Sequence, residues 1–352
     1  MPDTGSRIFR SPFFWFVLFS VSGFSVLVSY FLFSPAKNNP KNDSESHVSE
    51  IREQGYTFIN PLLECSQAEG AINRNMLSFR SDVFELTERQ KKEGLASEIG
   101  VYFRDLNNGP WFGVDEKREF VPASLLKIPL MLNFYKIAET RPQVLHEKLT
   151  LKAKYPFDGY YQNYPPREAI QVGQEYTIED LIRRTIIYSD NDAANLVYFE
   201  AFPHLESRGL LDNASNALNR DLRYLDEIFG NAKDHVSAKD YAAFFRILFN
   251  SSYLDRILSE HALEILAEVD FPNGLRKGVP AEIKIAHKFG EAGSNDSAYE
   301  LHDCGIIYYP DSPYLLCVMT KGVDQKKLPL VIQQISKLVY EKVDRQVKDS
   351  NE

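Results

Sequence analysis

Predicted strands lie at both ends of the folded part of the chain, and predicted helices fill the long stretch between them. Residues 99–104 and 111–114 are typical of two short strands around a turn. Later strand candidates cover residues 283–288, 305–309 and 314–320. Helix N-cap signals at Thr177 and Ser237 precede apolar runs in the middle of the chain. Neither group of strands can bury an apolar face alone, so both are expected to join one sheet.

The fold class predicted from this order is α+β: a five-stranded antiparallel sheet flanked by N- and C-terminal helices plus an inserted all-helical region. Amphipathic stretches at residues 75–93 and 328–343 are expected to cover one face of the sheet. The helical region would pack against the other face and leave a cleft at the seam. A chain of 352 residues with 44% hydrophobic residues is large enough to bury such a core.

The N-terminal part of the chain differs from the rest. Residues 11–36 include no charged side chain, and residues 13–33 are almost entirely apolar, which matches the ~20 residues of a transmembrane helix. A cleavable signal peptide is the alternative, but its apolar core is only ~7–15 residues long, and no clear small-x-small site follows here. Arg7 and Arg10 precede the run and favour a cytoplasmic N-terminus.

We therefore predict a short cytoplasmic segment, a transmembrane anchor, a polar linker, a folded domain and a short tail. Their bounds are 1–12, 13–34, 35–55, 56–346 and 347–352. The expected location is the cell membrane, crossed once, with the folded domain outside the cytoplasm. Both a periplasm and the cell exterior fit this prediction.

Composition excludes several kinds of partner. The net charge of −9 and the pI near 5.4 argue against nucleic acid, because phosphate binding needs a basic surface. The seven histidines are scattered without metal-ligand spacing, so neither a metal nor another cofactor is expected. Nothing in the sequence indicates an oligomeric state.

The chain has three cysteines, so they cannot all pair within one molecule. Cys304 and Cys317 lie on neighbouring predicted strands and could point to the same face. Both a disulfide and buried free thiols fit this placement. Buried free thiols are the favoured interpretation.

Ser124 and Lys127 form the first of three short motifs that follow one another along the chain. Ser124 falls at the start of a predicted buried helix, and Lys127 lies three residues later on the same face. A serine hydroxyl is a poor nucleophile unless a base takes its proton. A lysine amine can act as that base if burial or nearby cations hold it neutral. The alternative is a capping serine next to a lysine that extends to solvent.

The second motif, Ser189-Asp190-Asn191, lies between two predicted helices. Its hydroxyl could relay a proton and its amide could hold a substrate, although Asn191 could also simply cap the next helix. The third motif, Lys288-Phe289-Gly290, ends an alternating strand. Gly290 allows close approach of a ligand or another backbone, and Lys288 adds positive charge for a carboxylate. A lysine on an edge strand is the alternative there.

Together the three motifs resemble the active-site set of the penicillin-recognising serine enzymes, in which Ser-x-x-Lys, Ser-Asp-Asn and Lys-Thr/Ser-Gly converge on one cleft. Their order and spacing, and the sequence around them, resemble the class A β-lactamase catalytic domain over residues 70–345. Residues 60–65 also resemble the lead-in of membrane-anchored relatives of that family. The resemblance implies a β-lactamase/transpeptidase-like fold.

The resemblance implies an acyl-enzyme mechanism. Ser124 would attack a carbonyl, with Lys127 as a candidate base. Ser189 would pass a proton to the leaving nitrogen. Asn191 would hold Lys127 and the substrate amide, and Lys288 would attract the substrate carboxylate. The site would thus act without a metal.

The resemblance also implies an oxyanion site between the backbone N–H groups of Ser124 and Glu291, the residue after Gly290. The chain departs from the family pattern at Phe289, where Thr or Ser is usual. Phe289 has no hydroxyl for a substrate carboxylate. Substrate affinity or choice is therefore expected to differ from that of typical relatives.

A second departure concerns deacylation, for which class A β-lactamases use the glutamate of a Glu-x-x-Leu-Asn loop. The nearest match here starts at Glu227, with Gly230 in place of the leucine. Glu227 is thus either the deacylation base or a solvated acid beside Asp226. The aromatic loop at residues 155–166 could rim the cleft or pack on its own domain.

The predicted function is that of a membrane-anchored serine hydrolase that forms an acyl-enzyme on Ser124 with a β-lactam. The alternatives are a penicillin-binding D,D-peptidase acting on cell-wall D-Ala-D-Ala peptides and a non-hydrolytic penicillin or peptidoglycan receptor. The predicted cytoplasmic segment is too short to hold an output domain, which disfavours the receptor. A glutaminase-like amidase shares the Ser-x-x-Lys chemistry, but the export anchor disfavours it.

Overall fold

The computed structural model describes residues 50–52, 55–65, 74–107, 109–155, 162–208, 235–293 and 298–351. The predicted anchor at residues 13–34 and the predicted deacylation residue Glu227 both lie outside these ranges. Among the helices that are described, none is both long and apolar enough to cross a bilayer.

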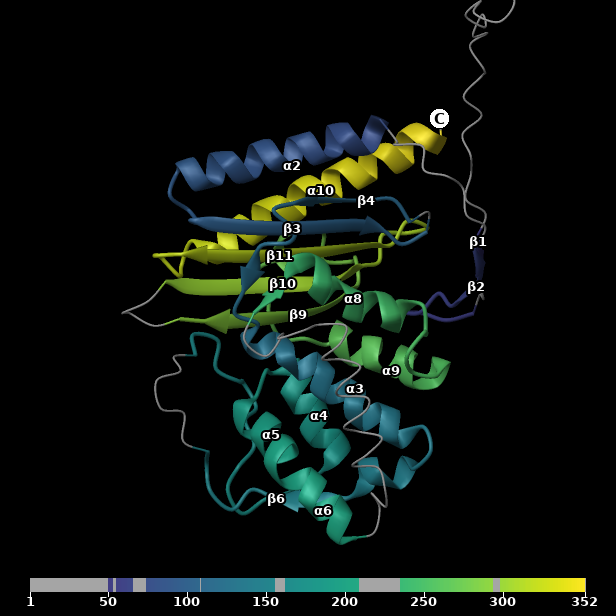
Figure 1. Ribbon diagram of the computed structural model, residues 1–352, viewed down its shortest axis with the longest axis vertical. Coiled ribbons are helices and arrows are strands. Elements are labelled where there is room, and N and C mark those ends of the chain that lie inside the picture. Colours follow the sequence, from purple (N-terminus) through teal and green to yellow (C-terminus); the bar gives the residue numbers. More distant parts are fainter. Residues whose placement is uncertain are drawn as a thin grey trace, which may run out of the picture. The chain divides into compact units, whose positions relative to one another are not determined.

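A five-stranded antiparallel sheet forms the centre of the fold, in the order β4-β3-β11-β10-β9 (Figure 1). Its strands are β3 (Glu98–Asp105), β4 (Trp111–Val114), β9 (Ile285–Ala292), β10 (Tyr299–Ile307) and β11 (Tyr314–Gly322). The two early strands and the three late strands therefore meet in one sheet, which confirms the predicted fold class. The β9 edge of the sheet carries the third motif.

Helices cover both faces of the sheet (Figure 1). One face packs against α2 (Arg74–Lys92) and α10 (Leu328–Asn351). The helical region contains α3 (Lys127–Ala138), α4 (Ile178–Ile187), α5 (Asn191–Leu196), the π-helix η4 (Val197–Ala201), α6 (Phe202–Ser207), α8 (Ala238–Phe249) and α9 (Arg256–Ala267). Of these helices, α8 packs on the opposite face of the sheet and α9 on β9.

Short strands and single turns connect these layers. The strand pairs are β1 (Glu50–Arg52) with β2 (Leu62–Cys65), β5 (Glu119–Phe120) with β8 (Val236–Ser237), and β6 (Lys148–Thr150) with β7 (Glu175–Thr177). The short 3₁₀ turns are η2 (Ala123–Leu126), η3 (Pro142–His146) and η5 (Arg276–Gly278).

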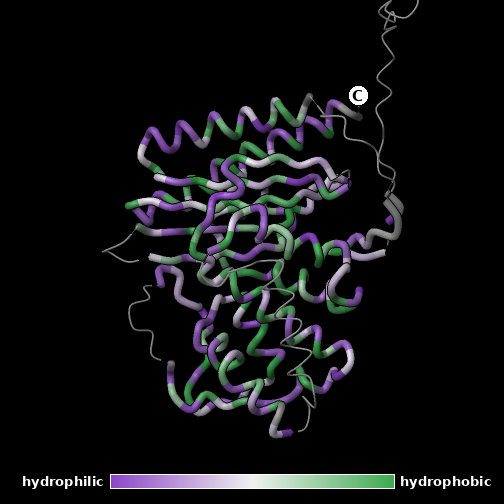
Figure 2. Tube along the Cα trace, viewed as in Figure 1, coloured by the Kyte–Doolittle hydropathy of each residue, from purple (hydrophilic) through white to green (hydrophobic). Residues whose placement is uncertain are grey.

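The sheet separates two hydrophobic clusters, because side chains alternate between its faces. On β3, Val101 and Phe103 pack toward α2 and α10, whereas Tyr102 belongs to the cluster that contains the helical region. Hydrophobic residues follow the strands and the packed sides of the helices (Figure 2). Burial of each large apolar side chain contributes about 1.5–3 kcal/mol. The cluster that contains Tyr102 holds the helical region against the sheet, and the other cluster holds α2 and α10 against it.

The predicted helix starts at Thr177 and Ser237 are confirmed. The Thr177 side chain accepts the N–H of Asp180 at the start of α4, and the Ser237 side chain accepts the N–H of Asp240 at the start of α8. Caps of this kind contribute about 1 kcal/mol each.

The predicted strand at residues 305–309 has the wrong bounds, because β10 begins at Tyr299. Its first half carries Glu300, His302 and Asp303, and charged residues are rarely buried unless they are paired. All three are buried here, and each has hydrogen-bond or ion-pair partners. The sequence pattern does not reveal these partners, so the predicted strand began too late.

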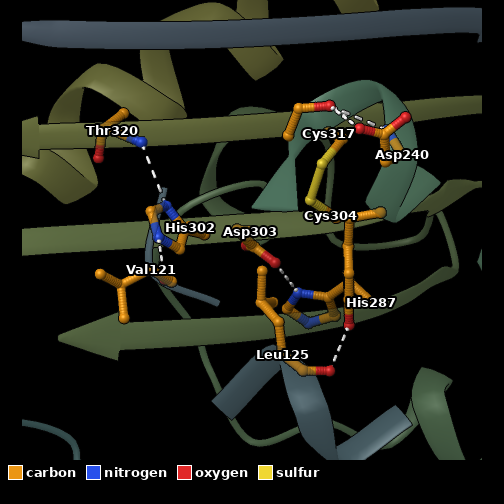
Figure 3. The surroundings of a disulfide bond; sticks show 11 residues. Val121, Leu125, Asp240, His287, His302, Asp303, Cys304, Cys317 and Thr320 are labelled. Atoms are coloured by element: carbon orange, nitrogen blue, oxygen red, sulfur yellow. Dashed lines mark hydrogen bonds and ion pairs between the residues drawn. A yellow bond between two sulfur atoms is a disulfide. The ribbon is translucent and has the colours of Figure 1, made fainter. Parts of the chain in front are cut away.

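The interpretation of the cysteines as buried free thiols is wrong. Cys304 of β10 and Cys317 of β11 form a disulfide (Figure 3). The two residues face each other in the antiparallel register, and both are fully buried. Pairing depends on this register, and a shift by one residue would have placed the thiols on opposite faces.

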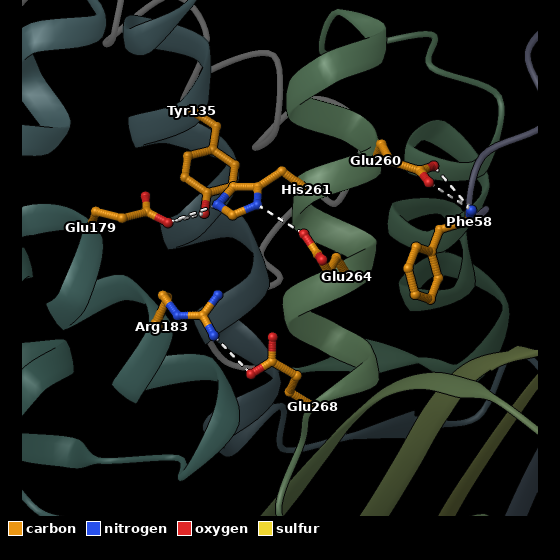
Figure 4. A network of polar contacts seen from close by, with 8 residues as sticks. All are labelled: Phe58, Tyr135, Glu179, Arg183, Glu260, His261, Glu264 and Glu268. Atoms are coloured by element: carbon orange, nitrogen blue, oxygen red, sulfur yellow. Dashed lines mark hydrogen bonds and ion pairs between the residues drawn. The ribbon is translucent and has the colours of Figure 1, made fainter. Parts of the chain in front are cut away.

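The segment before the first long helix docks on α9. The Glu260 carboxylate accepts the backbone N–H groups of Thr57, Phe58 and Ile59, at 2.7 Å in the case of Thr57 (Figure 4). The hydroxyl of Tyr308 donates to the carbonyl oxygen of Phe58. These contacts fix the start of the predicted folded domain to α9 and to the residue that follows β10.

A half-buried histidine connects α4 and α9. The Nε2 atom of His261 lies 2.8 Å from Glu179 Oε1, and its Nδ1 atom lies 3.3 Å from Glu264 Oε2 (Figure 4). Tyr135 also donates to Glu179. The hydrogen bond that His261 donates to Glu179 raises the pKa of His261, although burial opposes the shift. Protonated His261 therefore bridges two carboxylates.

We predict that this bridge makes stability depend on pH. A histidine whose pKa is raised by folding stabilises the fold fully below its unfolded pKa, and the contribution is lost as pH rises through the folded pKa. The wild type should lose up to about 1 kcal/mol relative to His261→Gln between about pH 6 and pH 9. Urea unfolding of both proteins across this range measures the difference, and parallel pH profiles would contradict the bridge.

Candidate active site

The Ser124 turn lies between the sheet and the helical region. Ser124 belongs to η2, a 3₁₀ turn that runs directly into α3, so the helix predicted from this residue begins with a tighter turn. Ala123 before it has a φ of 48°, which is strained for a residue with a side chain. Such a conformation persists only where neighbours fix it.

Buried side chains of β10 hold the chain just before this turn. The carboxylate of Glu300 accepts the N–H of Val121 at 2.8 Å, and His302 Nε2 lies 3.0 Å from the carbonyl oxygen of Val121 (Figure 3). His302 Nδ1 accepts the N–H of Thr320, so Nε2 carries the proton that it donates to Val121. Both backbone groups of Val121 are thus fixed by the sheet.

Lys127 is buried one turn beyond Ser124. Its Nζ donates to the carbonyl oxygen of Ser189 at 2.7 Å, to the Ser189 hydroxyl at 3.0 Å and to Asn191 Oδ1 at 2.6 Å. Burial lowers the pKa of Lys127 to about 7, against the opposing effect of the Asp190 and Glu291 carboxylates. A large fraction of this amine is therefore neutral near pH 7 and able to take a proton.

The second motif forms a strained turn between α4 and α5. Ser189 has a φ of 53°. The side chain of Asp190 caps α5 by accepting the N–H groups of Asp192 and Ala193. The alternative role of Asn191 as the helix cap is therefore wrong. Because Asp190 serves as the cap, the amide of Asn191 is available to bind Lys127.

Lys288 reaches the same serine from the sheet. It is fully buried, and its Nζ donates to the Ser189 hydroxyl at 3.1 Å and to the carbonyl oxygen of Phe289 at 3.0 Å. Burial lowers the pKa of Lys288 well below its usual range, and the nearby Lys127 lowers it further. The structure thus brings Lys127, Ser189, Asn191 and Lys288 into one hydrogen-bonded cluster.

Gly290 lets β9 pass directly against the Ser124 turn. A Cβ atom at this position would lie 2.9 Å from Leu125 Cγ, 3.0 Å from the carbonyl oxygen of Pro122 and 3.1 Å from the backbone nitrogen of Leu125. Two of these atoms belong to the backbone and cannot move easily. Glycine is therefore required for the close approach that the third motif predicted.

Phe289 belongs to an aromatic cluster beside the lysines. Its ring stacks on Phe271 at a centroid distance of 4.2 Å and meets the edge of Tyr164 at 5.9 Å. Lys288 Nζ lies 4.2 Å from the centroid of the Phe289 ring. An apolar wall thus stands where the family pattern has a hydroxyl.

The described ends of the aromatic loop at residues 155–166 pack on the domain itself. Tyr155 stacks on Phe199, and Tyr164 meets Phe271 and Phe289 edge-on. Gln162 from the same loop contacts the second motif, because its Oε1 accepts from Asn191 Nδ2 at 3.3 Å. The loop therefore packs on its own domain and borders the cluster of motifs, so both interpretations hold in part.

Sequence reasoning missed several residues of this site. Gln162, Glu300 and His302 belong to no motif, and their roles depend on contacts between distant segments. The Glu291 side chain was also missed, since only its backbone was considered. The one available signal was the run of ionisable residues in β10 next to apolar residues.

Comparisons with known proteins agree with this geometry. The profile of the β-lactamase enzyme family matches residues 84–343. The chain belongs to this family. The curated β-lactamase L2 of Stenotrophomonas maltophilia is 24% identical over 209 residues, which cover 58% of this chain and 67% of that protein.

Solved structures share the fold at lower identity. PBP-A has a TM-score of 0.59 at 21% identity, with 76% of this chain and 96% of that chain covered. The class A β-lactamase of the last common ancestor of Gram-negative bacteria has a TM-score of 0.58 at 23% identity, with 75% and 98% covered. A β-lactamase from Xanthomonas campestris has a TM-score of 0.60 at 21% identity, with 75% and 98% covered. The predicted resemblance to class A β-lactamases is confirmed, and family membership makes the protein a serine hydrolase at the level of the family.

We predict that the reactivity of Ser124 follows the protonation of Lys127. If neutral Lys127 takes the serine proton, the rate of covalent modification rises with pH and levels off above about pH 7. Lys127→Arg should lower the rate about 10²–10⁴-fold, because a guanidinium stays protonated. Labelling by a neutral fluorophosphonate, followed by mass spectrometry, measures both effects. A rate that does not change between pH 5 and pH 9 would exclude Lys127 as the base.

A second prediction concerns the contact between β9 and the Ser124 turn. Gly290→Ala should force the turn and the strand apart, destabilise the protein by about 1–3 kcal/mol and reduce labelling of Ser124. Thermal unfolding and labelling of the purified variant test this expectation. An unchanged melting temperature together with unchanged labelling would show that the contact is not tight in solution.

Proposed function

We propose that this protein is a membrane-anchored serine hydrolase that forms an acyl-enzyme on Ser124 with a β-lactam. The observation that carries the proposal is the buried Lys127 amine, which is bound to Ser189 and Asn191 one turn beyond Ser124. Membership of the β-lactamase family supports the same chemistry. A serine, a neutral amine and a second hydroxyl are the groups that acyl transfer needs.

In the proposed acylation step, Ser124 Oγ forms a bond to the β-lactam carbonyl carbon while its proton passes to Lys127 Nζ. The carbon–nitrogen bond then breaks. The leaving nitrogen takes a proton from the Ser189 hydroxyl, which regains one from the Lys127 ammonium. The hydrogen bond between Lys127 and Ser189 supports this relay. Water then hydrolyses the ester and restores the Ser124 hydroxyl.

Other residues would bind the substrate. Backbone N–H groups of Ser124 and Glu291 would stabilise the oxyanion, and the contact of Gly290 with the Ser124 turn supports this pairing. Asn191 would hold the substrate amide while its Oδ1 binds Lys127. Lys288 would add positive charge on the side of the sheet. None of these roles needs a metal.

The breakdown of the acyl-enzyme decides between two activities. If Glu227 activates water, the protein is a β-lactamase. If it does not, a penicillin-binding D,D-peptidase that acts on D-Ala-D-Ala peptides is the second candidate. The similarity to PBP-A favours keeping this candidate, because a mutant of PBP-A has been solved as an acyl-enzyme complex with penicillin G.

The proposed location is the outer side of the cytoplasmic membrane. The uncharged run at residues 11–36 supports an anchor. The disulfide between Cys304 and Cys317 supports an oxidising compartment, since disulfides are rare in the cytosol. Both observations favour a folded domain outside the cytoplasm.

We predict that benzylpenicillin modifies Ser124 covalently. The full-length protein in detergent is mixed with benzylpenicillin, and its intact mass is followed over time. An adduct with the mass of the penicillin should form on the wild type and be absent from Ser124→Ala. If the wild type gains no mass, acylation by benzylpenicillin is ruled out.

The lifetime of the adduct separates the two candidates. A lasting adduct supports a D,D-peptidase. Rapid turnover that is converted to a lasting adduct by Glu227→Gln supports a β-lactamase. The substitution keeps the size of the side chain and removes only its charge and basicity.

A further inference from the structure

The side chain of Glu291 follows the glycine of the third motif on β9. Side chains alternate along a strand, so Glu291 points to the same side of β9 as Phe289, whereas Gly290 faces the Ser124 turn. Tyr164 contacts both residues: its ring meets Phe289, and its N–H donates to Glu291 Oε1 at 3.1 Å. Phe289, which is buried, packs together with Glu291 and Tyr164 in a cluster that we call the β9 wall.

The carboxylate of Glu291 is held in a fixed position. Its Oε2 accepts the backbone N–H and the Nδ2 of Asn163, both at 3.2 Å. Gln325 Nε2 also donates to Oε2, at 3.4 Å. Together with the N–H of Tyr164, these donors come from two separate segments of the chain. These donors hold the carboxylate in place. Burial raises the pKa of Glu291, whereas the hydrogen bonds from Tyr164 and Asn163 and the charge of Lys127 oppose this shift and favour the ionised form.

The charge of Glu291 acts on both lysines of the cluster. Burial lowers the pKa values of Lys127 and Lys288, and the charge of Glu291 opposes this shift at both residues. The carboxylate is thus close enough to interact with both amines. A carboxylate on the substrate would be repelled by Glu291. Its attraction to the two lysines would also be weakened, because Glu291 already offsets part of their positive charge.

Lys288 and Phe289 offer few interactions to an anion. Lys288 is fully buried, and its amine already donates to Ser189 and to the carbonyl oxygen of Phe289. Phe289 presents a ring instead of a hydroxyl. A substrate carboxylate that entered the site would lose its hydration, and no hydroxyl at position 289 would donate a hydrogen bond to replace it.

We propose that Glu291, together with Phe289, is the specificity-determining residue of this site and selects acyl donors that carry no carboxylate beside the reacting carbonyl. Neutral and cationic donors avoid repulsion from Glu291, and a cationic group gains attraction. The inference rests on the proposed acylation of Ser124. It narrows the substrate class to neutral or positively charged β-lactams and acyl amides.

The test compares benzylpenicillin with its methyl ester on the full-length protein. Acylation rates of Ser124 are measured by intact mass for the wild type, for Glu291→Gln and for Glu282→Gln, an exposed glutamate that serves as the charge-matched control. The readout is the ratio of the acid rate to the ester rate within each protein, so a general change in reactivity cancels. Glu291→Gln should raise this ratio about tenfold, while Glu282→Gln leaves it unchanged.

The same comparison is made with a fluorophosphonate that bears a carboxylate and with its methyl ester. These probes label activated serines without β-lactam chemistry, so they test the inference even if penicillins do not react. A wild-type preference for the ester in this pair, lost in Glu291→Gln, supports the role of Glu291. A wild-type preference for the acid, or an equal ratio in wild type and Glu291→Gln, overturns it. If neither benzylpenicillin nor its methyl ester modifies Ser124, the proposed β-lactam substrate is refuted. The role of Glu291 is then decided by the fluorophosphonate pair.

Discussion

The buried amine of Lys127 is the interaction on which the rest of the site depends. A buried ammonium is costly unless acceptors surround it, and the turn at Ser189 supplies them with one carbonyl and one hydroxyl oxygen. Asn191 adds the third acceptor. The left-handed backbone of Ser189 is strained, and these hydrogen bonds offset that strain. The helix α3, which begins at Lys127, and the turn between α4 and α5 therefore keep each other in place.

The sheet contributes to the same geometry from the other side of the seam. Glu300 and His302 fix both backbone groups of Val121, so the strained residue before Ser124 has little freedom. Burial disfavours ionisation of Glu300, but its pKa is lowered to about 2 by His302, Lys321 and the N–H of Val121, so it stays charged at any ordinary pH. The serine is thus positioned by β10 and by α3 together. The contacts to Val121 come from β10, and the turn with Ser124 continues directly into α3.

Local signals in the sequence predicted the parts of this fold that depend on neighbours along the chain. The caps at Thr177 and Ser237 are confirmed, and so is the sheet that unites early and late strands. Features that depend on register were missed. The disulfide needs Cys304 opposite Cys317, and the early start of β10 needs partners for its charged residues. The three motifs pointed to the residues that meet in the hydrogen-bonded cluster, because each motif is recognisable from its own side chains. Gln162 and Glu300 take part only through contacts between distant segments.

Two amines that share one hydroxyl cannot both carry a full charge in a buried site. Lys127 and Lys288 both donate to Ser189, and each has a lowered pKa, chiefly through burial. At neutral pH the cluster therefore holds fewer protons than it has basic groups. Such a cluster is suited to accept and return a proton, because a neutral lysine amine hydrogen-bonded to Ser189 can take one up. It is less suited to bind an anion by charge alone. The carboxylate of Glu291, held by Asn163 and Tyr164, opposes the lowering of both lysine pKa values. Its negative charge also makes the cluster less suited to bind an anion.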